Sequence, residues 1–133
     1  MKVLVVDDCP DSRRLIRLVL ERLGGVEVVE CTDGIQAIER LGAFAADLII
    51  VDFDMPRMNG VTFVKTYRHQ DRRTPIIMLT GVNEKAFVVE AIRVGINDYV
   101  IKPFVAAGLA TRIRDVMERC GSGSRTGSGS KAA

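Results

Sequence analysis

The sequence has no tryptophan, a single histidine and no apolar run near the roughly 18 residues that a membrane-spanning helix needs. Its three cysteines, Cys9, Cys31 and Cys120, are odd in number and show no Cys-x-x-Cys spacing, which argues against a disulfide framework or a zinc site. The apolar stretch after Met1 is too short for a secretory signal. These absences predict a cytoplasmic protein with reduced thiols and no membrane contact.

Positive and negative charges are nearly balanced. The chain has 19 basic and 17 acidic residues, and two of the basic ones, Arg125 and Lys131, lie in the last thirteen residues. The remaining 120 residues therefore carry equal numbers of positive and negative charges. A neutral domain has no electrostatic footprint for nucleic acid, so we expect no direct nucleic-acid binding.

The last thirteen residues read GSGSRTGSGSKAA, a composition that cannot bury enough apolar area to offset the entropy of ordering the chain. We expect residues 121–133 to be a flexible tail, either a linker or a cloning scar. Residues 1–120 are long enough for one domain and too short for two ordinary ones. The sequence does not tell whether the chain stands alone or belongs to a longer regulator.

Short apolar runs alternate with segments of helical period. The runs predict strands at residues 3–6, 26–29, 48–51, 76–79 and 99–101, and the segments between them predict helices ending near residue 23 and spanning 34–41, 61–68, 84–94 and 105–120. Continuous apolar strands are typical of a parallel sheet covered on both faces. We therefore predict an α/β fold, a flavodoxin-like doubly wound (βα)5 three-layer sandwich with strand order 2-1-3-4-5.

Polar residues stand where four of these strands end: Asp7 and Asp8, Asp52, Thr80, and Lys102. In the predicted winding, these side chains meet at the carboxyl edge of the sheet, where such folds bind ligands. Three carboxylates placed together repel one another unless a cation shares them. Hard oxygen ligands suit Mg²⁺, for which Mn²⁺ could substitute.

Each of these residues also has an ordinary explanation when taken alone. Asp8 could cap the helix that begins near Pro10, Asp52 could start a turn, Thr80 could belong to a turn with the following glycine, and Lys102 could be solvated. A complementary set at four strand ends is much harder to explain by chance. The set therefore favours a functional site.

The motifs that carry these residues resemble those of response-regulator receiver domains of two-component signalling, the CheY-like superfamily. They are Val5-Val6-Asp7-Asp8, the run from Asp47 through Asp52 to Met55-Pro56, Asn59-Gly60, Met78-Leu79-Thr80, and the run from Asp98 to Phe104 that contains Lys102-Pro103. The resemblance covers residues 1 to about 120 in spacing as well as identity. It is specific enough to imply the family's fold and function.

The resemblance assigns a role to each site residue by its place in the motifs. It implies that Asp52 accepts a phosphoryl group and that a magnesium ion is held by Asp7, Asp8, Asp52 and the backbone carbonyl of Asp54. Thr80 and Lys102 are the hydroxyl and the cation that contact the phosphoryl oxygens. Thr80 and Tyr99 are the switch residues, and the Lys102–Pro103 peptide bond is cis.

The resemblance further implies a switch that catalyses only its own phosphorylation and dephosphorylation. The donor is a histidine kinase or a phosphotransfer protein. The response is a changed surface on helix 84–94, strand 99–101 and helix 105–120, which controls a target protein or output domain and could support a phosphorylation-dependent homodimer. Helix 84–94 has more apolar positions than one buried stripe uses, so some of them are expected to be exposed.

The resemblance implies that two variable positions tune hydrolysis of the acyl phosphate, and here they hold Asp54 and Val82, which predict slow self-dephosphorylation. Gly81 follows Thr80 where a small residue, often alanine, is usual in the family, a change that loosens the loop without removing function. Asp52-Phe53-Asp54 also suggests a haloacid-dehalogenase-like phosphatase, although that motif should open the first strand. A receiver-like docking module that is never phosphorylated is a third reading.

Overall fold

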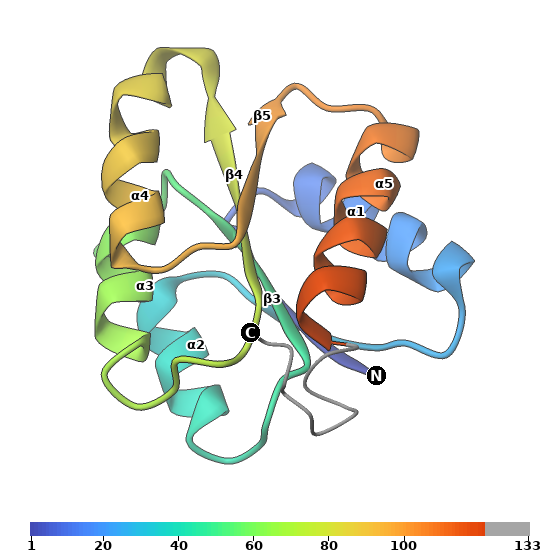
Figure 1. Ribbon diagram of the computed structural model, residues 1–133, viewed down its shortest axis with the longest axis horizontal. Coiled ribbons are helices and arrows are strands. Elements are labelled where there is room, and N and C mark those ends of the chain that lie inside the picture. The colour runs from blue at the N-terminus through green and yellow to red at the C-terminus, as the bar shows by residue number, and fades with distance from the viewer. Residues whose placement is uncertain (122–133) are drawn as a thin grey trace.

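The computed structural model describes residues 1–121, which form one parallel sheet between two layers of helices (Figure 1). The sheet has the order β2-β1-β3-β4-β5, and all neighbouring strands are parallel. The strands are β1 (Lys2–Val6), β2 (Glu27–Cys31), β3 (Leu48–Asp52), β4 (Ile76–Gly81) and β5 (Asp98–Lys102). The predicted fold class and strand order are therefore confirmed. Apart from Gly121, the predicted tail lies outside the described residues.

The helices divide between the two faces of the sheet. They are α1 (Pro10–Leu23), α2 (Gly34–Leu41), α3 (Gly60–Tyr67), α4 (Val88–Val94) and α5 (Ala106–Val116). Figure 1 shows α1 and α5 on one side of the sheet and α2, α3 and α4 on the other. This division follows from the strand order. The connection through α1 runs from β1 to β2, whereas the connections through α2, α3 and α4 run in the opposite direction along the sheet. When all of them are right-handed, connections that run in opposite directions cross opposite faces of the sheet.

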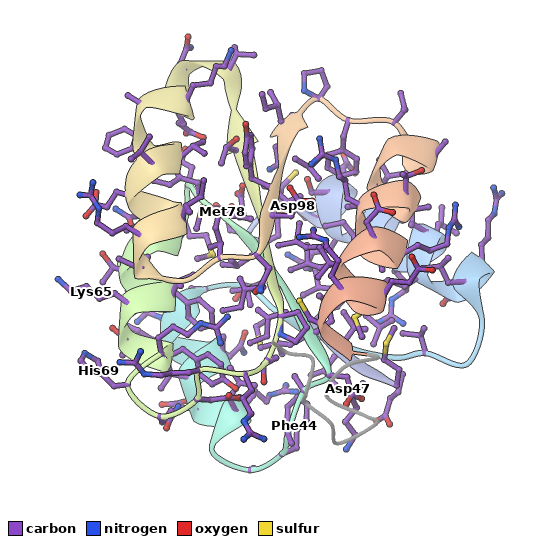
Figure 2. The ribbon with its side chains drawn as sticks, viewed as in Figure 1. Phe44, Asp47, Lys65, His69, Met78 and Asp98 are labelled. Atoms are coloured by element: carbon purple, nitrogen blue, oxygen red, sulfur yellow. The ribbon has the colours of Figure 1, made fainter. Side chains whose placement is uncertain are left out.

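The two layers explain why the central strands are apolar throughout. Alternate residues of β1 and β3 enter two separate cores: Leu4 and Ile49 face α2, α3 and α4, whereas Val3 and Ile50 face α1 and α5. In Figure 2, Met78 lies in the interior, while the Lys65 and His69 side chains extend outward from the end of α3. A polar substitution in either central strand would leave an unpaired group in one of the cores.

Short-range signals fix the helix ends that adjoin the carboxyl edge of the sheet. Asp33 caps α2 by accepting from Gln36 N–H, and Asn59 caps α3 by accepting from Thr62 N–H. Gly60 brings α3 against the end of β3, since a Cβ there would lie 2.7 Å from the carbonyl oxygen of Asp52. Only glycine permits this approach, so Asn59-Gly60 positions the loop that follows Asp52.

Four elements differ from the sequence prediction by more than one residue, among them β4, which ends at Gly81 rather than at residue 79. The helix expected over 84–94 is split into a 3₁₀ segment, η1 (Val82–Phe87), and the shorter α4, because a tighter first turn often precedes an α-helix. The helix expected over 105–120 ends at Val116 and continues as a π-helical turn, η2 (Met117–Gly121). The second strand begins one residue and ends two residues later than predicted, because edge strand β2 includes Glu30, which interrupts the apolar run.

Within residues 1–121, none of the helices combines the length and the apolar character needed to cross a membrane.

A polar cluster fastens the end of α3 to the start of β4. The carboxylate of Asp71 accepts from the hydroxyls of Tyr67 and Thr74, both at 2.5 Å, and from the backbone N–H of Arg73 at 2.8 Å. Burial alone would raise the pKa of Asp71, but these hydrogen bonds outweigh it and lower the pKa from 3.8 to about 2. The ionised carboxylate is therefore the form that stabilises the fold.

We expect Asp71→Asn to lower the free energy of unfolding at pH 7 by about 1 to 2 kcal/mol, because a charged acceptor of several hydrogen bonds is lost. The stabilisation by the ionised carboxylate is fully present above pH 3.8 and is lost as the pH falls toward 2. The difference in the free energy of unfolding between wild type and variant should therefore decrease below about pH 4. Urea denaturation across this range measures it. The exposed Asp115→Asn is the control, and a gap that does not change with pH would contradict the assignment.

Candidate phosphorylation and metal site

Four strands bring polar residues to the carboxyl edge of the sheet, toward which the arrows of β4 and β5 point in Figure 1. Asp7 directly follows β1, Asp52 ends β3, and Lys102 ends β5. Thr80 lies near the end of β4, where the register pairs it with Ile101. The parallel register, rather than any local motif, is what brings residues far apart in sequence to one place.

The acidic residues form a compact cluster. Carboxylate oxygens of Asp7, Asp8 and Asp52 all lie within 4.8 Å of one another. Asp7 is completely buried and Asp52 is 5% exposed, whereas Asp8 is exposed. The Lys102 ammonium lies 3.0 Å from Asp52 Oδ1 and 3.5 Å from Asp7 Oδ2, so it contacts both buried carboxylates.

Burial and neighbouring charges shift the pKa values of Asp52 and Lys102. Burial and then the negative charge of Asp7 raise the pKa of Asp52 to about 7, although Lys102 opposes the shift. Burial would lower the pKa of Lys102, but Asp52 and Asp7 outweigh it and raise the pKa. One lysine thus keeps its charge but does not fully compensate the three neighbouring carboxylates.

The cluster fits a hard divalent cation. Asp7 Oδ1 accepts from Cys9 N–H at 2.9 Å. Asp7 Oδ2 is buried and has no hydrogen-bond partner among residues 1–121, where its contact with Lys102 at 3.5 Å is an ion pair. An unsatisfied buried carboxylate oxygen is costly unless something else coordinates it. Three converging carboxylates with such an oxygen are suitable ligands for Mg²⁺, in part with water in the remaining positions.

The cluster opens into a cleft of about 510 Å³ that Asp8, Asp52, Asp54, Glu84 and Lys102 help to line. Both acidic and basic groups reach it, which suits a ligand that carries both a cation and anionic oxygens.

Thr80 and Tyr99, the two predicted switch residues, lie on adjacent strands. The Thr80 hydroxyl is buried and has no hydrogen-bond partner in the part of the chain that the structure describes. Tyr99 is partly buried and packs against the core on the α2, α3 and α4 side. The Lys102–Pro103 peptide bond is cis, as the resemblance implied.

The ordinary explanations for two of these residues do not apply. Helix α1 begins with Pro10 at its first position and Cys9 at the N-cap, where no side chain accepts a hydrogen bond, so Asp8 is not its cap. Asp52 is the last residue of a strand rather than the start of a turn. Helix capping and turn formation therefore do not explain why Asp8 and Asp52 stand at these positions.

Sequence reasoning missed two residues at the site. Glu84 accepts from the N–H of Gly81 at 2.6 Å and lines the cleft. A glutamate three residues after a helix-start position is a recognisable signal for such a contact. Arg13 donates to the carbonyl oxygen of Asp7 at 2.8 Å, a contact that no sequence motif indicates.

Comparison with known proteins places the chain in a family. The family model of the response regulator receiver domain matches residues 3–114. The chemotaxis protein CheY1 of Helicobacter pylori is 42% identical over 120 residues, which cover 88% of this chain and 97% of that protein. A CheY homolog of Campylobacter jejuni is 39% identical and covers all of this chain and 99% of its own.

Solved structures agree with the sequence comparisons. The receiver domain of NtrX from Brucella abortus superposes with a TM-score of 0.82 at 29% identity, covering 87% of this chain and 98% of that one. Chemotaxis protein CheY4 of Vibrio cholerae gives a TM-score of 0.80 at 35% identity, covering 86% of this chain and 97% of its own. Sequence and structure therefore agree, and the chain belongs to the response-regulator receiver domains of the CheY type.

Proposed function

We propose that the protein is a phosphorylation switch in which Asp52 accepts a phosphoryl group from a histidine kinase or a phosphotransfer protein. The observation that carries the proposal is the convergence of Asp7, Asp8 and Asp52 with Lys102 at one edge of the sheet. A buried carboxylate with the Lys102 ammonium beside it and a cleft next to it is suited to act as a nucleophile.

The transfer follows from the placement of the side chains. An oxygen of Asp52 attacks the phosphorus of a phosphohistidine; the new O–P bond forms as the P–N bond breaks, and the imidazole leaves with the electron pair. Lys102, 3.0 Å from Asp52 Oδ1, offsets negative charge on the transferred group. The unpartnered hydroxyl of Thr80 can donate to a phosphoryl oxygen. Mg²⁺ bound by Asp7, Asp8, Asp52 and the Asp54 carbonyl would reduce the repulsion between nucleophile and phosphate.

The site has a physical route to an apolar surface. Phe53, the residue after Asp52, stacks on Phe87 with ring centroids 5.0 Å apart. Phe87 is 46% exposed, and Val89 and Ile92 of the following helix α4 are 63% and 54% exposed. A shift of the loop after β3 would therefore move part of an exposed apolar surface, which is suited to a protein target, an output domain or a second copy of the chain.

We expect Asp52→Asn to abolish phosphorylation, since the amide cannot act as the nucleophile. Wild type incubated with acetyl phosphate and Mg²⁺ should gain one phosphoryl group per chain by intact mass, and a chelator should prevent the gain. Asp115→Asn is the matched control, because it makes the same change at an exposed carboxylate on α5 that does not line the cleft.

The same incubation separates the alternatives. Sustained release of phosphate from many phosphate esters would indicate a phosphatase of the haloacid-dehalogenase type. A wild-type protein that gains no mass with any small phosphodonor would instead be a docking module.

We expect slow self-dephosphorylation, with a lifetime of the acyl phosphate of minutes or longer. Asp54 and Val82 are both exposed: a carboxylate at position 54 disfavours an approaching hydroxide, and valine at position 82 cannot orient a water. Val82→Gln should shorten the lifetime by about 10-fold or more, because the amide can hold the attacking water. Val82→Leu should leave it unchanged. A wild-type lifetime of seconds would disprove this account.

A further inference from the structure

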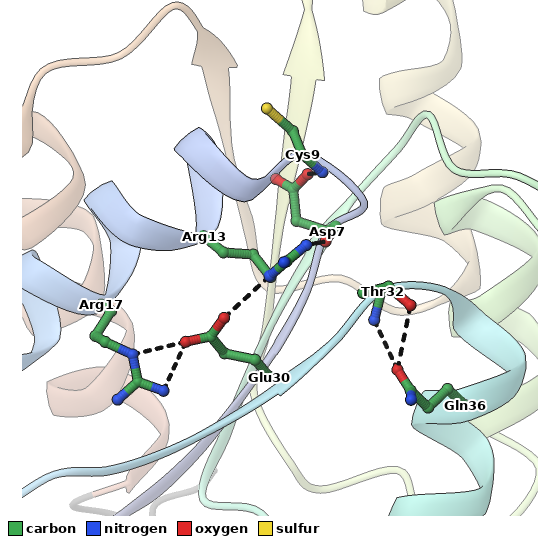
Figure 3. A network of polar contacts seen from close by, with 7 residues as sticks. All are labelled: Asp7, Cys9, Arg13, Arg17, Glu30, Thr32 and Gln36. Atoms are coloured by element: carbon green, nitrogen blue, oxygen red, sulfur yellow. Dashed lines mark hydrogen bonds and ion pairs between the residues drawn. The ribbon is translucent and has the colours of Figure 1, made fainter.

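A network of two arginines and Glu30 joins the edge strand β2 to Asp7 (Figure 3). Arg13, in the first turn of α1, donates from Nη1 to the carbonyl oxygen of Asp7 at 2.8 Å and from Nε to Glu30 Oε1 at 3.0 Å. Arg17 binds the other carboxylate oxygen of Glu30 at 2.6 Å. Arg13 therefore contacts the Glu30 carboxylate through Nε and the Asp7 carbonyl oxygen through Nη1.

Hydrogen bonds restrain the backbone of Asp7 as well as its side chain. Its backbone N–H donates to the carbonyl oxygen of Cys31 at 3.1 Å, and its carboxylate accepts from the N–H of Cys9. The carbonyl that Arg13 holds belongs to the planar peptide that joins Asp7 to Asp8. Fixing that oxygen therefore fixes the orientation of the peptide and the direction in which Asp8 leaves it.

Glu30 is well suited to anchor Arg13. Its carboxylate is 28% exposed and lies between two guanidinium groups, and burial, which would raise its pKa, is outweighed by Arg17 and Arg13, which lower it. A guanidinium presents its donors in a rigid fork, so one anchored Nε–H also orients the Nη1–H that reaches Asp7.

We propose that Arg13 is a positioning residue for the metal site: anchored by Glu30, it holds the Asp7–Asp8 peptide in the orientation that lets both carboxylates bind one divalent cation. The inference rests on the proposed Mg²⁺ site. It assigns Arg13 no contact with the cation or the phosphoryl group. A residue that orients metal ligands in this way acts on metal affinity rather than on the chemical step.

The test is a Mg²⁺ titration of the full chain followed by ¹H–¹⁵N NMR, which measures the dissociation constant without any phosphodonor. We expect Arg13→Gln to raise the dissociation constant by roughly 10-fold. Arg17→Gln removes contacts with Glu30 but none with Asp7, and Arg14→Gln alters an exposed neighbour on α1. Neither should weaken binding.

The sign of the change separates positioning from simple electrostatics. Removing a positive charge near a cation site should tighten Mg²⁺ binding if charge alone matters. The proposal predicts the opposite for Arg13→Gln. Arg13→Lys keeps the charge but loses the fork that reaches both partners, so it should also weaken binding. Unchanged or tighter binding by both Arg13 variants would overturn the proposal, and so would an equal loss in Arg17→Gln.

A double-mutant cycle tests whether Glu30 acts through Arg13. Glu30→Gln should weaken Mg²⁺ binding in the wild-type background and have no further effect in the Arg13→Gln background. Additive effects would mean that Glu30 acts on the cation by charge and would contradict the anchoring role. The NMR spectrum of each variant reports whether it is folded, and if Arg13→Gln does not fold, Arg13→Lys carries the test. A wild type that does not bind Mg²⁺ would refute the proposed function itself.

Discussion

The structure depends on one electrostatic constraint: three carboxylates are gathered at the carboxyl edge of a parallel sheet with a single lysine beside them. Two of the acids, Asp7 and Asp52, are buried, and the Lys102 ammonium contacts both. Asp7 Oδ2 has no hydrogen-bond partner among the described residues, and burial together with the negative charge of Asp7 raises the pKa of Asp52 to about 7. A fold tolerates such repulsion where a bound cation relieves it.

The surrounding scaffold keeps these groups in place from several directions. Gly60 allows α3 to approach the end of β3, and the two apolar cores hold the central strands between the helical layers. Glu84 links η1 to the end of β4 by accepting from Gly81 N–H. On the other side, Arg13 links the carbonyl of Asp7 to Glu30 on the edge strand. A few side chains therefore carry out the chemistry, and contacts with neighbouring elements hold those side chains in position.

Most of the fold was predictable because its signals are local. Continuous apolar runs located the central strands, and strand ends located Asp7, Asp52, Thr80 and Lys102. The bounds of edge strand β2 were predicted less accurately, since Glu30 breaks its apolar run and is paired with Arg13 and Arg17 of α1. The split of the predicted helix 84–94 was not visible in its periodicity. Contacts such as Arg13 with Asp7 depend on side-chain paths between elements, which no short-range pattern encodes.

The most direct test of the central claim is a crystal structure of the protein grown with Mg²⁺ and beryllofluoride, a mimic of the phosphoryl group. The account predicts a metal ion coordinated by the acidic cluster and beryllium bonded to a carboxylate oxygen of Asp52, with the Thr80 hydroxyl and the Lys102 ammonium contacting the fluorines. Beryllofluoride bound at another residue, or a metal ion bound away from Asp7, Asp8 and Asp52, would contradict it.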